Sequence, residues 1–140
     1  MKKLFILAAM IFGLATISTG QTVQLLNPSA TSTLDTATNA GTMYLAGRVT
    51  GAGTAVIQLN VTKVSGTVAG SASIQASIDN STNPASWFAV PGSDTLTLAD
   101  ASQVKAWTVT ANALHYRVKY TTTGTQKSTP KAYILLKKTN

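Results

Sequence analysis

Few side chains in this sequence are of the types that carry out acid–base or nucleophilic chemistry. The chain has one histidine, His115, four acidic residues that are all aspartate, and no cysteine. A Ser-His-Asp arrangement around His115 is arithmetically available, but the sequence lacks the strand-turn-helix motif that exposes a nucleophilic serine. Local alternation also places His115 on the polar side of its strand, as in an ordinary surface histidine. We therefore predict no catalytic residues and no enzymatic activity.

The aspartates give little support for hydrolysis or metal binding. Each stands in a turn-like sequence, where Asp caps its own backbone: Asp35, Asp79, Asp94 and Asp100. Asp79 shares an oxygen-rich loop with Asn80 and Asn83, and this loop is either a structural turn or a calcium site. One histidine cannot supply the ligands of a transition metal, and the loop spacing departs from the acidic calcium-loop pattern. We predict no metal site and no cofactor, with calcium as the alternative.

Large aromatic residues could form either a sugar-binding face or the bulky part of a core. Trp107, Tyr116 and Tyr120 occupy regular strand patterns, which favours the core. Trp87 follows the polar loop and is the aromatic residue that we expect to be exposed. Together with Asp79, Asn80 and Asn83 of that loop, Trp87 forms the predicted ligand-binding set.

The elements that would position these residues are predicted to be strands. Threonine and valine favour strands, and apolar residues alternate with polar ones over residues 55–64, 71–79 and 115–121. Glycines between the first two segments predict a hairpin that joins them in one antiparallel sheet with one wet face. In the third segment Tyr116, Val118 and Tyr120 face one side, and His115, Arg117 and Lys119 face the other.

Shorter strand patterns recur along the rest of the chain, separated by turn residues. They lie at residues 22–26, 42–49, 87–90, 96–98, 106–110 and 133–136. This spacing predicts an all-β fold, an antiparallel β-sandwich of the jelly-roll or immunoglobulin-like type. Residues 42–140 are the predicted sandwich domain, and no second domain or internal repeat is recognisable.

The first twenty residues have the order of a secretory signal peptide. Lys2 and Lys3 precede an apolar run of about 14 residues, and small residues lead to a cleavage point near Gly20-Gln21. The alternative is a retained membrane anchor, but the run is shorter than the roughly 20 residues that a spanning helix needs. We therefore predict a secreted or cell-surface protein with no membrane span in the mature chain.

The chain is basic, with a formal net charge of +7. Removing Lys2 and Lys3 with the signal leaves +5. The basic residues are spread thinly, which indicates a solvated surface, while an acidic partner is the alternative. No run of like charge is long enough to predict nucleic-acid binding.

Residues 21–41 hold few large apolar side chains and form a predicted N-terminal arm or loop. Such an arm could add a strand to the exposed sheet edge of a neighbouring molecule, through Gln21, Val23, Leu25 and Leu26. The alternative is a disordered leader.

Two motifs resemble a known class of modules. The string IQASID at residues 74–79 precedes a loop and Trp87, and YRVKY at residues 116–120 is followed by Gly124-Thr125 and a last strand. This resembles small β-sandwich modules of tailed-phage and prophage virion proteins. The resemblance implies a non-enzymatic structural role in decoration, in a fibre or in receptor contact. The signal peptide departs from that class and extends the implied role to a bacterial surface or extracellular filament subunit.

Two functions remain open from the sequence. The first is a structural subunit that assembles with copies of itself or with a larger extracellular or virion particle. The alternative is a carbohydrate- or cell-surface-binding module, which would use Trp87 and the polar loop to hold a surface glycan.

Overall fold

The computed structural model describes residues 22–28, 36–51, 53–79 and 83–138. Most of these residues lie in strands, and the described helical structure is one turn of 3-10 helix, η1 (Pro84–Ser86). The strands are β1 (Thr22–Pro28), β2 (Ala37–Thr38), β3 (Gly41–Arg48), β4 (Gly53–Gly66), β5 (Gly70–Ser77), β6 (Phe88–Ala89), β7 (Leu96–Thr97), β8 (Gln103–Ala111), β9 (His115–Thr122) and β10 (Gln126–Lys138).

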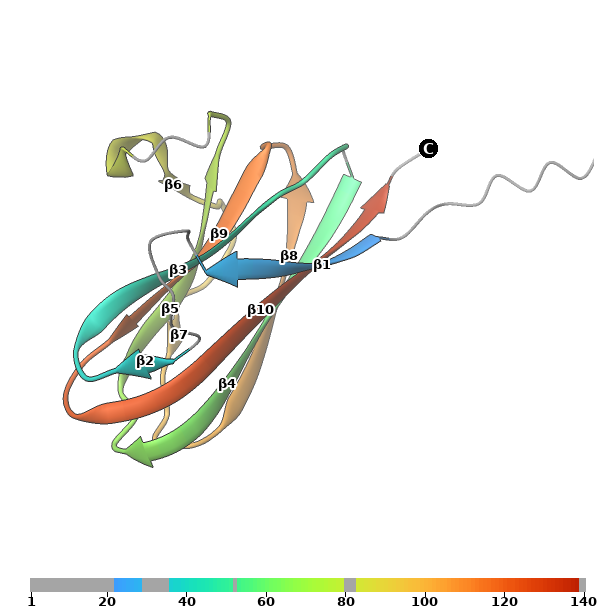
Figure 1. The fold of residues 1–140 in the computed structure, drawn as a ribbon. Coiled ribbons are helices and arrows are strands. Elements are labelled where there is room, and N and C mark those ends of the chain that lie inside the picture. The colour runs from blue at the N-terminus through green and yellow to red at the C-terminus, as the bar shows by residue number, and fades with distance from the viewer. Residues whose placement is uncertain (1–21, 29–35, 52, 80–82, 139–140) are drawn as a thin grey trace, which may run out of the picture.

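The strands form two antiparallel layers that face each other as a β-sandwich, as predicted (Figure 1). The β5 sheet contains β6, β5, β9 and β3, and the β4 sheet contains β10, β4 and β8. Strand β1 joins the two layers, because its first part pairs with β10 and its last two residues pair with β3. The short strands β2 and β7 pair with β10 and β5. The sandwich is thus closed along β1 and open between the two ends of the strand order, β6 and β8.

Consecutive long strands lie in opposite sheets, which corrects the predicted hairpin. Strand β4 pairs with β10 and β8, whereas β5 pairs with β9 and β6. The three residues between them cross from one layer to the other, and Gly66 and Gly70 permit this with φ of +70° and +128°. Val68 at the crossing is 1% exposed, because its side chain fills the end of the core. Alternation identified the inward residues of both strands correctly except at the end of β5, where Ile78, expected inward, is 68% exposed and Ser77, expected outward, is buried. It carried no information on the partners of the two strands.

The core consists of the alternating apolar residues that the two sheets turn toward each other. Those of the β4 sheet include Ala55, Ile57, Leu59, Val61, Trp107, Val109, Ala132 and Ile134. Those of the β5 sheet include Leu45, Ala72, Ile74, Ala76, Tyr116, Val118 and Tyr120. Trp107, Tyr116 and Tyr120 are 3% exposed or less, so their predicted place in the core is confirmed. This packing fixes which side chains the outer faces present.

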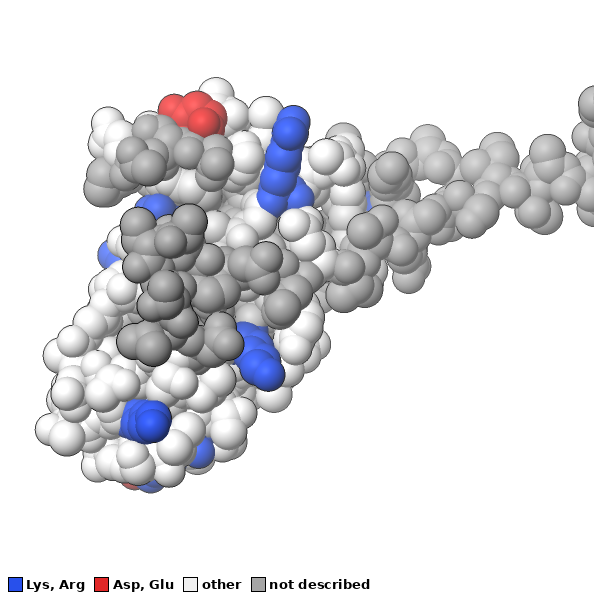
Figure 2. All heavy atoms as spheres, in the orientation of Figure 1, with Lys and Arg blue, Asp and Glu red and all other residues white. Residues whose placement is uncertain are grey.

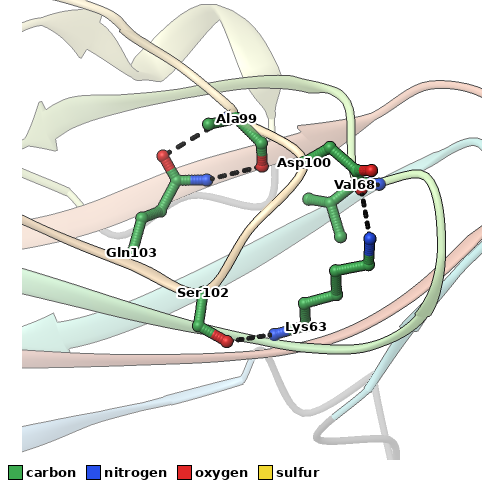
Figure 3. Close-up of polar contacts among 6 residues, drawn as sticks. All are labelled: Lys63, Val68, Ala99, Asp100, Ser102 and Gln103. Carbon is green, nitrogen blue, oxygen red and sulfur yellow. Dashed lines mark hydrogen bonds and ion pairs between the residues drawn. The ribbon is translucent and has the colours of Figure 1, made fainter.

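Polar contacts tie the long connection before β8 to the crossing between β4 and β5 (Figure 3). The Asp100 carboxylate accepts hydrogen bonds from Lys63 Nζ and from the Val68 backbone N–H, both at 2.7 Å. The Lys63 backbone N–H donates to Ser102 Oγ, and Gln103 makes two hydrogen bonds with the backbone of Ala99. These contacts lower the pKa of Asp100, first through the Lys63 hydrogen bond and then through Val68.

The Tyr116 hydroxyl fixes the connection between β8 and β9. It accepts hydrogen bonds from the backbone N–H groups of Asn112 at 3.0 Å and Ala113 at 3.2 Å. It also donates to the carbonyl oxygen of Thr110. The arrangement has the form of a tyrosine corner, in which a strand-initial tyrosine bonds back to the preceding turn. It sets the position from which β9 begins.

The N-terminal segment takes part in the sandwich. The structure places Val23, Leu25 and Leu26 in β1, where they pair with β10 of the same chain, and Leu26 is 1% exposed. The predicted arm over residues 21–41 thus contributes β1 and β2, and the sandwich begins before residue 42. Gln21 and the predicted signal peptide at residues 1–20 lie outside the described residues. Within the part of the chain described, no helix is long and apolar enough to cross a membrane.

Candidate binding face

The outer face of the β5 sheet presents polar and aromatic side chains in register. Antiparallel pairing of β5, β9 and β3 groups them in cross-strand rows. From the end nearest η1, the rows are Ser77, His115 and Arg48; Gln75, Arg117 and Ala46; Ser73, Lys119 and Tyr44; and Ser71, Thr121 and Thr42. At about 3.4 Å per residue these rows extend over roughly 20 Å. We call this surface the β5 outer face.

Arg117 is held between two aromatic rings on this face. Its Cζ lies 4.0 Å from the ring centroid of Tyr44 and 4.0 Å from that of Trp87. Tyr44 comes from the next row of β3, and the small Ala46 opposite Arg117 leaves room for the ring. Trp87 comes from the segment after η1, which brings its ring onto the face from the β5 side. The guanidinium is therefore fixed by contacts from both sides.

Gln75 completes the arrangement. It stands opposite Arg117 in the same row, and the Arg117 Nε–H donates to Gln75 Oε1 at 2.8 Å. Arg117 is 9% exposed, and this burial lowers its pKa, although Tyr44 opposes the shift. The ion pairs of the described residues are Lys63–Asp100 and Lys105–Asp94, so they do not involve Arg117.

His115 occupies the neighbouring position along β9 on the same face. Burial is the first cause that lowers its pKa below 6.5, and the positive charge of Arg48 is the second. The Asp79 carboxylate acts in the opposite direction and raises the pKa. His115 is therefore mainly neutral at pH 7, and the lasting positive charges of the face are those of Arg48, Arg117 and Lys119.

The basic residues are not gathered into a continuous tract. Figure 2 shows Lys and Arg as isolated groups on a largely uncharged surface, with acidic atoms most visible near the end that carries η1. The face visible in Figure 2 therefore has no broad basic patch that would attract a polyanion.

Trp87 does not have the exposure that we predicted for it. The residue is 8% exposed, because its ring covers Arg117 instead of facing solvent. The exposed neighbour is Phe88, which is 47% exposed and pairs with β5 through the edge strand β6. Trp87 still belongs to the candidate site, but as a wall of the Arg117 stack.

The polar loop residues make local contacts. Ser77 Oγ donates to Asp79 Oδ1 at 2.8 Å, and Asn83 Oδ1 accepts from the Ala85 backbone N–H at 3.0 Å. Such contacts are typical of a structural turn, one of the two alternatives for this loop, in which Asp and Asn side chains bond to nearby groups. Asn80 lies outside the described residues. No group of three or more His, Cys, Asp or Glu side chains suited to a metal ion occurs among the residues described.

Ser77, Asp79 and His115 lie near one another but are not arranged as a catalytic triad. Ser77 pairs with His115 across β5 and β9. A nucleophilic serine gives its hydroxyl proton to the histidine, whereas Ser77 donates to Asp79. Ser77 is also fully buried, so its oxygen cannot reach a substrate.

Apart from this face, a hollow lies between β2 and β3, with a volume of about 230 Å³. Its lining residues are Thr36, Ala37, Thr38, Gly41, Thr42, Met43, Tyr120 and Thr122. None of them is charged, so this hollow offers hydroxyl groups and apolar surface. The β5 outer face has the greater variety of recognition groups.

The sequence did not single out Tyr44, Gln75 or Arg117 as a site. Alternation did place Arg117 on the side of β9 opposite Tyr116 and Val118, which is correct. The missing information is that Trp87, thirty positions earlier, folds back over that side. The available signal was in two sequence strings, I-Q in β5 and Y-R-V in β9. Their Gln75 and Arg117 stand opposite each other in one row of the sheet.

Comparison with known proteins gives little further guidance. No family model matches the chain, and no curated protein matches it. Among solved structures, the chain is similar to a carbohydrate-binding module, CBM6cm-2, of Cellvibrio mixtus lichenase 5A in complex with cellotriose. The two share 10% sequence identity and a TM-score of 0.36, over 86% of this chain and 91% of the module. A likeness of this size carries no argument about a ligand.

Proposed function

We propose that this chain is an exported, non-enzymatic binding module whose β5 outer face holds a surface glycan. The observation that carries the proposal is the Tyr44–Arg117–Trp87 stack with its Gln75 partner. A planar cationic donor fixed next to a half-exposed aromatic ring is a combination that recognises polar, ring-shaped ligands. Export is supported by the signal-like order of residues 1–20.

The chemistry of sugars fits the groups on this face. A pyranose ring has an apolar C–H side that packs on an aromatic ring, and hydroxyl groups that exchange hydrogen bonds with planar polar side chains. Tyr44 supplies the ring, while Arg117 and Gln75 supply the planar groups. The next rows of the face present further hydroxyl groups, including those of Ser73 and Thr121. The hydroxyl oxygens of Thr42 and Thr121 are hydrogen-bonded to each other at 3.2 Å.

The test compares two tyrosines on opposite sides of the sandwich. Tyr44 and Tyr133 are both half-buried, but Tyr44 lies on the β5 outer face and Tyr133 on the outer side of β10. On an array of bacterial and plant glycans, Tyr44→Ala is expected to lower retention of the bound glycans at least tenfold. Tyr133→Ala is the matched control and is expected to leave retention unchanged. Equal losses in both variants, or no glycan retained by the wild type, would refute the proposal.

A second candidate function is assembly with further copies of the chain. The observation in its favour is β8, a strand of nine residues that among the described strands pairs only with β4. Its edge residue Val104 is 66% exposed, and Lys105 beside it is engaged by Asp94 at 2.7 Å. The free edge of a strand of this length is a template for strand addition by a neighbour.

A further inference from the structure

We infer that Arg117 is a subsite for a carboxylate, so that the glycan held by the β5 outer face contains uronic acids. The inference rests on the proposed function and names the ligand class of the same face. It follows from three properties of Arg117: its burial without an acidic partner, its fixed orientation, and the charges around it.

The first property is a buried cation without a counter-ion. Arg117 is 9% exposed, and neither ion pair of the described residues includes it. Rings and an amide oxygen replace part of the lost hydration, but neither carries a negative charge. A carboxylate that approaches this guanidinium meets a cation that has already been stripped of most of its water.

The second property is that the edge of the guanidinium formed by the two Nη groups is held in a fixed position. Gln75 takes the Nε–H, and no described residue accepts a hydrogen bond from the two Nη groups. Among the described residues, the only fully buried side-chain nitrogen and oxygen atoms without a hydrogen bond are those of Gln126. The Nη atoms of Arg117 are not in that group, so they remain in reach of solvent. Two parallel Nη–H donors match the two oxygens of a carboxylate.

The third property is the sign of the local charge. Arg48 and Lys119 flank Arg117 on the same face, in the rows on either side. The one described acid at this end, Asp79, accepts a hydrogen bond from Ser77. The positive charges of Arg48 and Lys119 therefore favour an anion at Arg117.

The planar fork of Arg117 fits the shape of a carboxylate. A carboxylate is planar and lies in the plane of the guanidinium when both oxygens are bound, and that plane is fixed here between two rings. Sulfate and phosphate can also take two parallel N–H bonds, with their other two oxygens directed away from the guanidinium, so the test below includes polymers that carry them. We assign the subsite to a uronate, because both oxygens of its carboxylate fit the fixed plane of the guanidinium; tighter binding of a sulfated sugar or a nucleic acid would overturn this assignment.

The experiment compares polygalacturonate with the same polymer after full methyl esterification. Esterification removes the charge and keeps the sugar backbone, so the pair isolates the carboxylate. The purified wild-type protein is expected to bind the free acid at least tenfold more tightly, as measured by affinity electrophoresis or calorimetry at physiological ionic strength. This comparison needs no variant, so it decides the question even where a substitution at position 117 prevents folding.

Three variants assign the preference to Arg117. Arg117→Lys keeps the charge but loses the planar fork, and Arg117→Met keeps an unbranched chain between the rings without the charge. Both are expected to reduce the preference for the free acid to below twofold. Lys137→Gln removes one exposed charge from the opposite sheet, and the preference is expected to survive.

The outcomes separate this inference from the proposed function. Equal binding of acid and ester, with loss of both in Tyr44→Ala, would overturn the carboxylate subsite and leave glycan binding in place. Failure to bind any glycan would overturn both. Equal or tighter binding of heparin or single-stranded DNA, with unchanged preference in Arg117→Lys, would show that general charge attraction acts in place of the subsite.

Discussion

Replacing Tyr116 with phenylalanine tests the corner from which β9 carries His115 and Arg117 to the outer face. The change removes a fully buried hydroxyl that accepts from the Asn112 and Ala113 N–H groups at 3.0 and 3.2 Å. The Asn112 N–H keeps a second acceptor, the Thr110 carbonyl at 3.1 Å. The Ala113 N–H does not, and Ala113 is 7% exposed. The variant thus leaves one buried donor without its acceptor.

The expected cost follows from that count. One orphaned buried donor costs about 1–3 kcal/mol of unfolding free energy. For a domain of this size, each kcal/mol corresponds to a fall of roughly 3–6 °C in the melting temperature. Urea denaturation is expected to show a lower midpoint with an unchanged slope, since the surface exposed on unfolding stays the same.

Tyr133→Phe is the matched control for this loss. Tyr133 is half-buried on the outer side of β10, and its hydroxyl makes no hydrogen bond with the described residues. Its replacement is expected to change stability by less than about 0.5 kcal/mol. Equal effects of Tyr116→Phe and Tyr133→Phe would refute the view that the corner is held by the hydroxyl, and would assign its rigidity to the packing of the ring alone.

Two further predictions concern other parts of the sandwich. Lys63 and Val68 lower the pKa of Asp100, and Lys105 lowers the pKa of Asp94. Both carboxylates therefore stabilise the fold above pH 3.8, the ordinary value. They lose this effect as the pH falls through their lower pKa values in the folded state. Urea midpoints at pH 7 and pH 3 are expected to differ less in the Asp94→Asn, Asp100→Asn double variant than in the wild type; an equal difference would contradict these shifts. If β8 mediates assembly, light scattering is expected to show oligomers for the wild type and monomers for Val104→Lys, whereas Val64→Lys, 53% exposed on β4, keeps the oligomer. A wild type that stays monomeric at millimolar concentration would exclude this edge as an interface.

The sequence was sufficient to predict a two-layered β-sandwich and the inward faces of its long strands. It was not sufficient to predict which strands pair with each other. Alternation over residues 55–64 and 115–121 predicted the inward residues of β4 and β9, because side chains alternate between faces whatever the neighbouring strand is. The same alternation is satisfied by a hairpin and by two strands in opposite sheets. What distinguishes them here is the three-residue crossing with Val68 inserted in the core, a contact that local pattern does not encode.

The candidate site was harder to predict because its members are distant in sequence. Trp87 belongs to a loop, and loop residues carry no periodicity that would show which surface they cover. Arg117 was correctly placed on the wet side of β9, yet Trp87 and Tyr44 bury it there. A polar position on a strand therefore predicts the face of the sheet and leaves the exposure of the side chain undetermined.

Stability alone does not account for an arginine at position 117. The stack lies outside the core, and the sandwich interior is complete without it. An unbranched apolar side chain would fill the same space between Tyr44 and Trp87 without the cost of removing a cation from water. Gln75 would then be free of its bond to Nε, and its amide could turn to solvent. A buried guanidinium that keeps its Nη groups at the surface is thus better explained by what approaches from outside than by what it contributes to the fold. Arg117→Met separates these two explanations, because a binding role predicts that it retains its melting temperature and loses the preference for the acidic polymer.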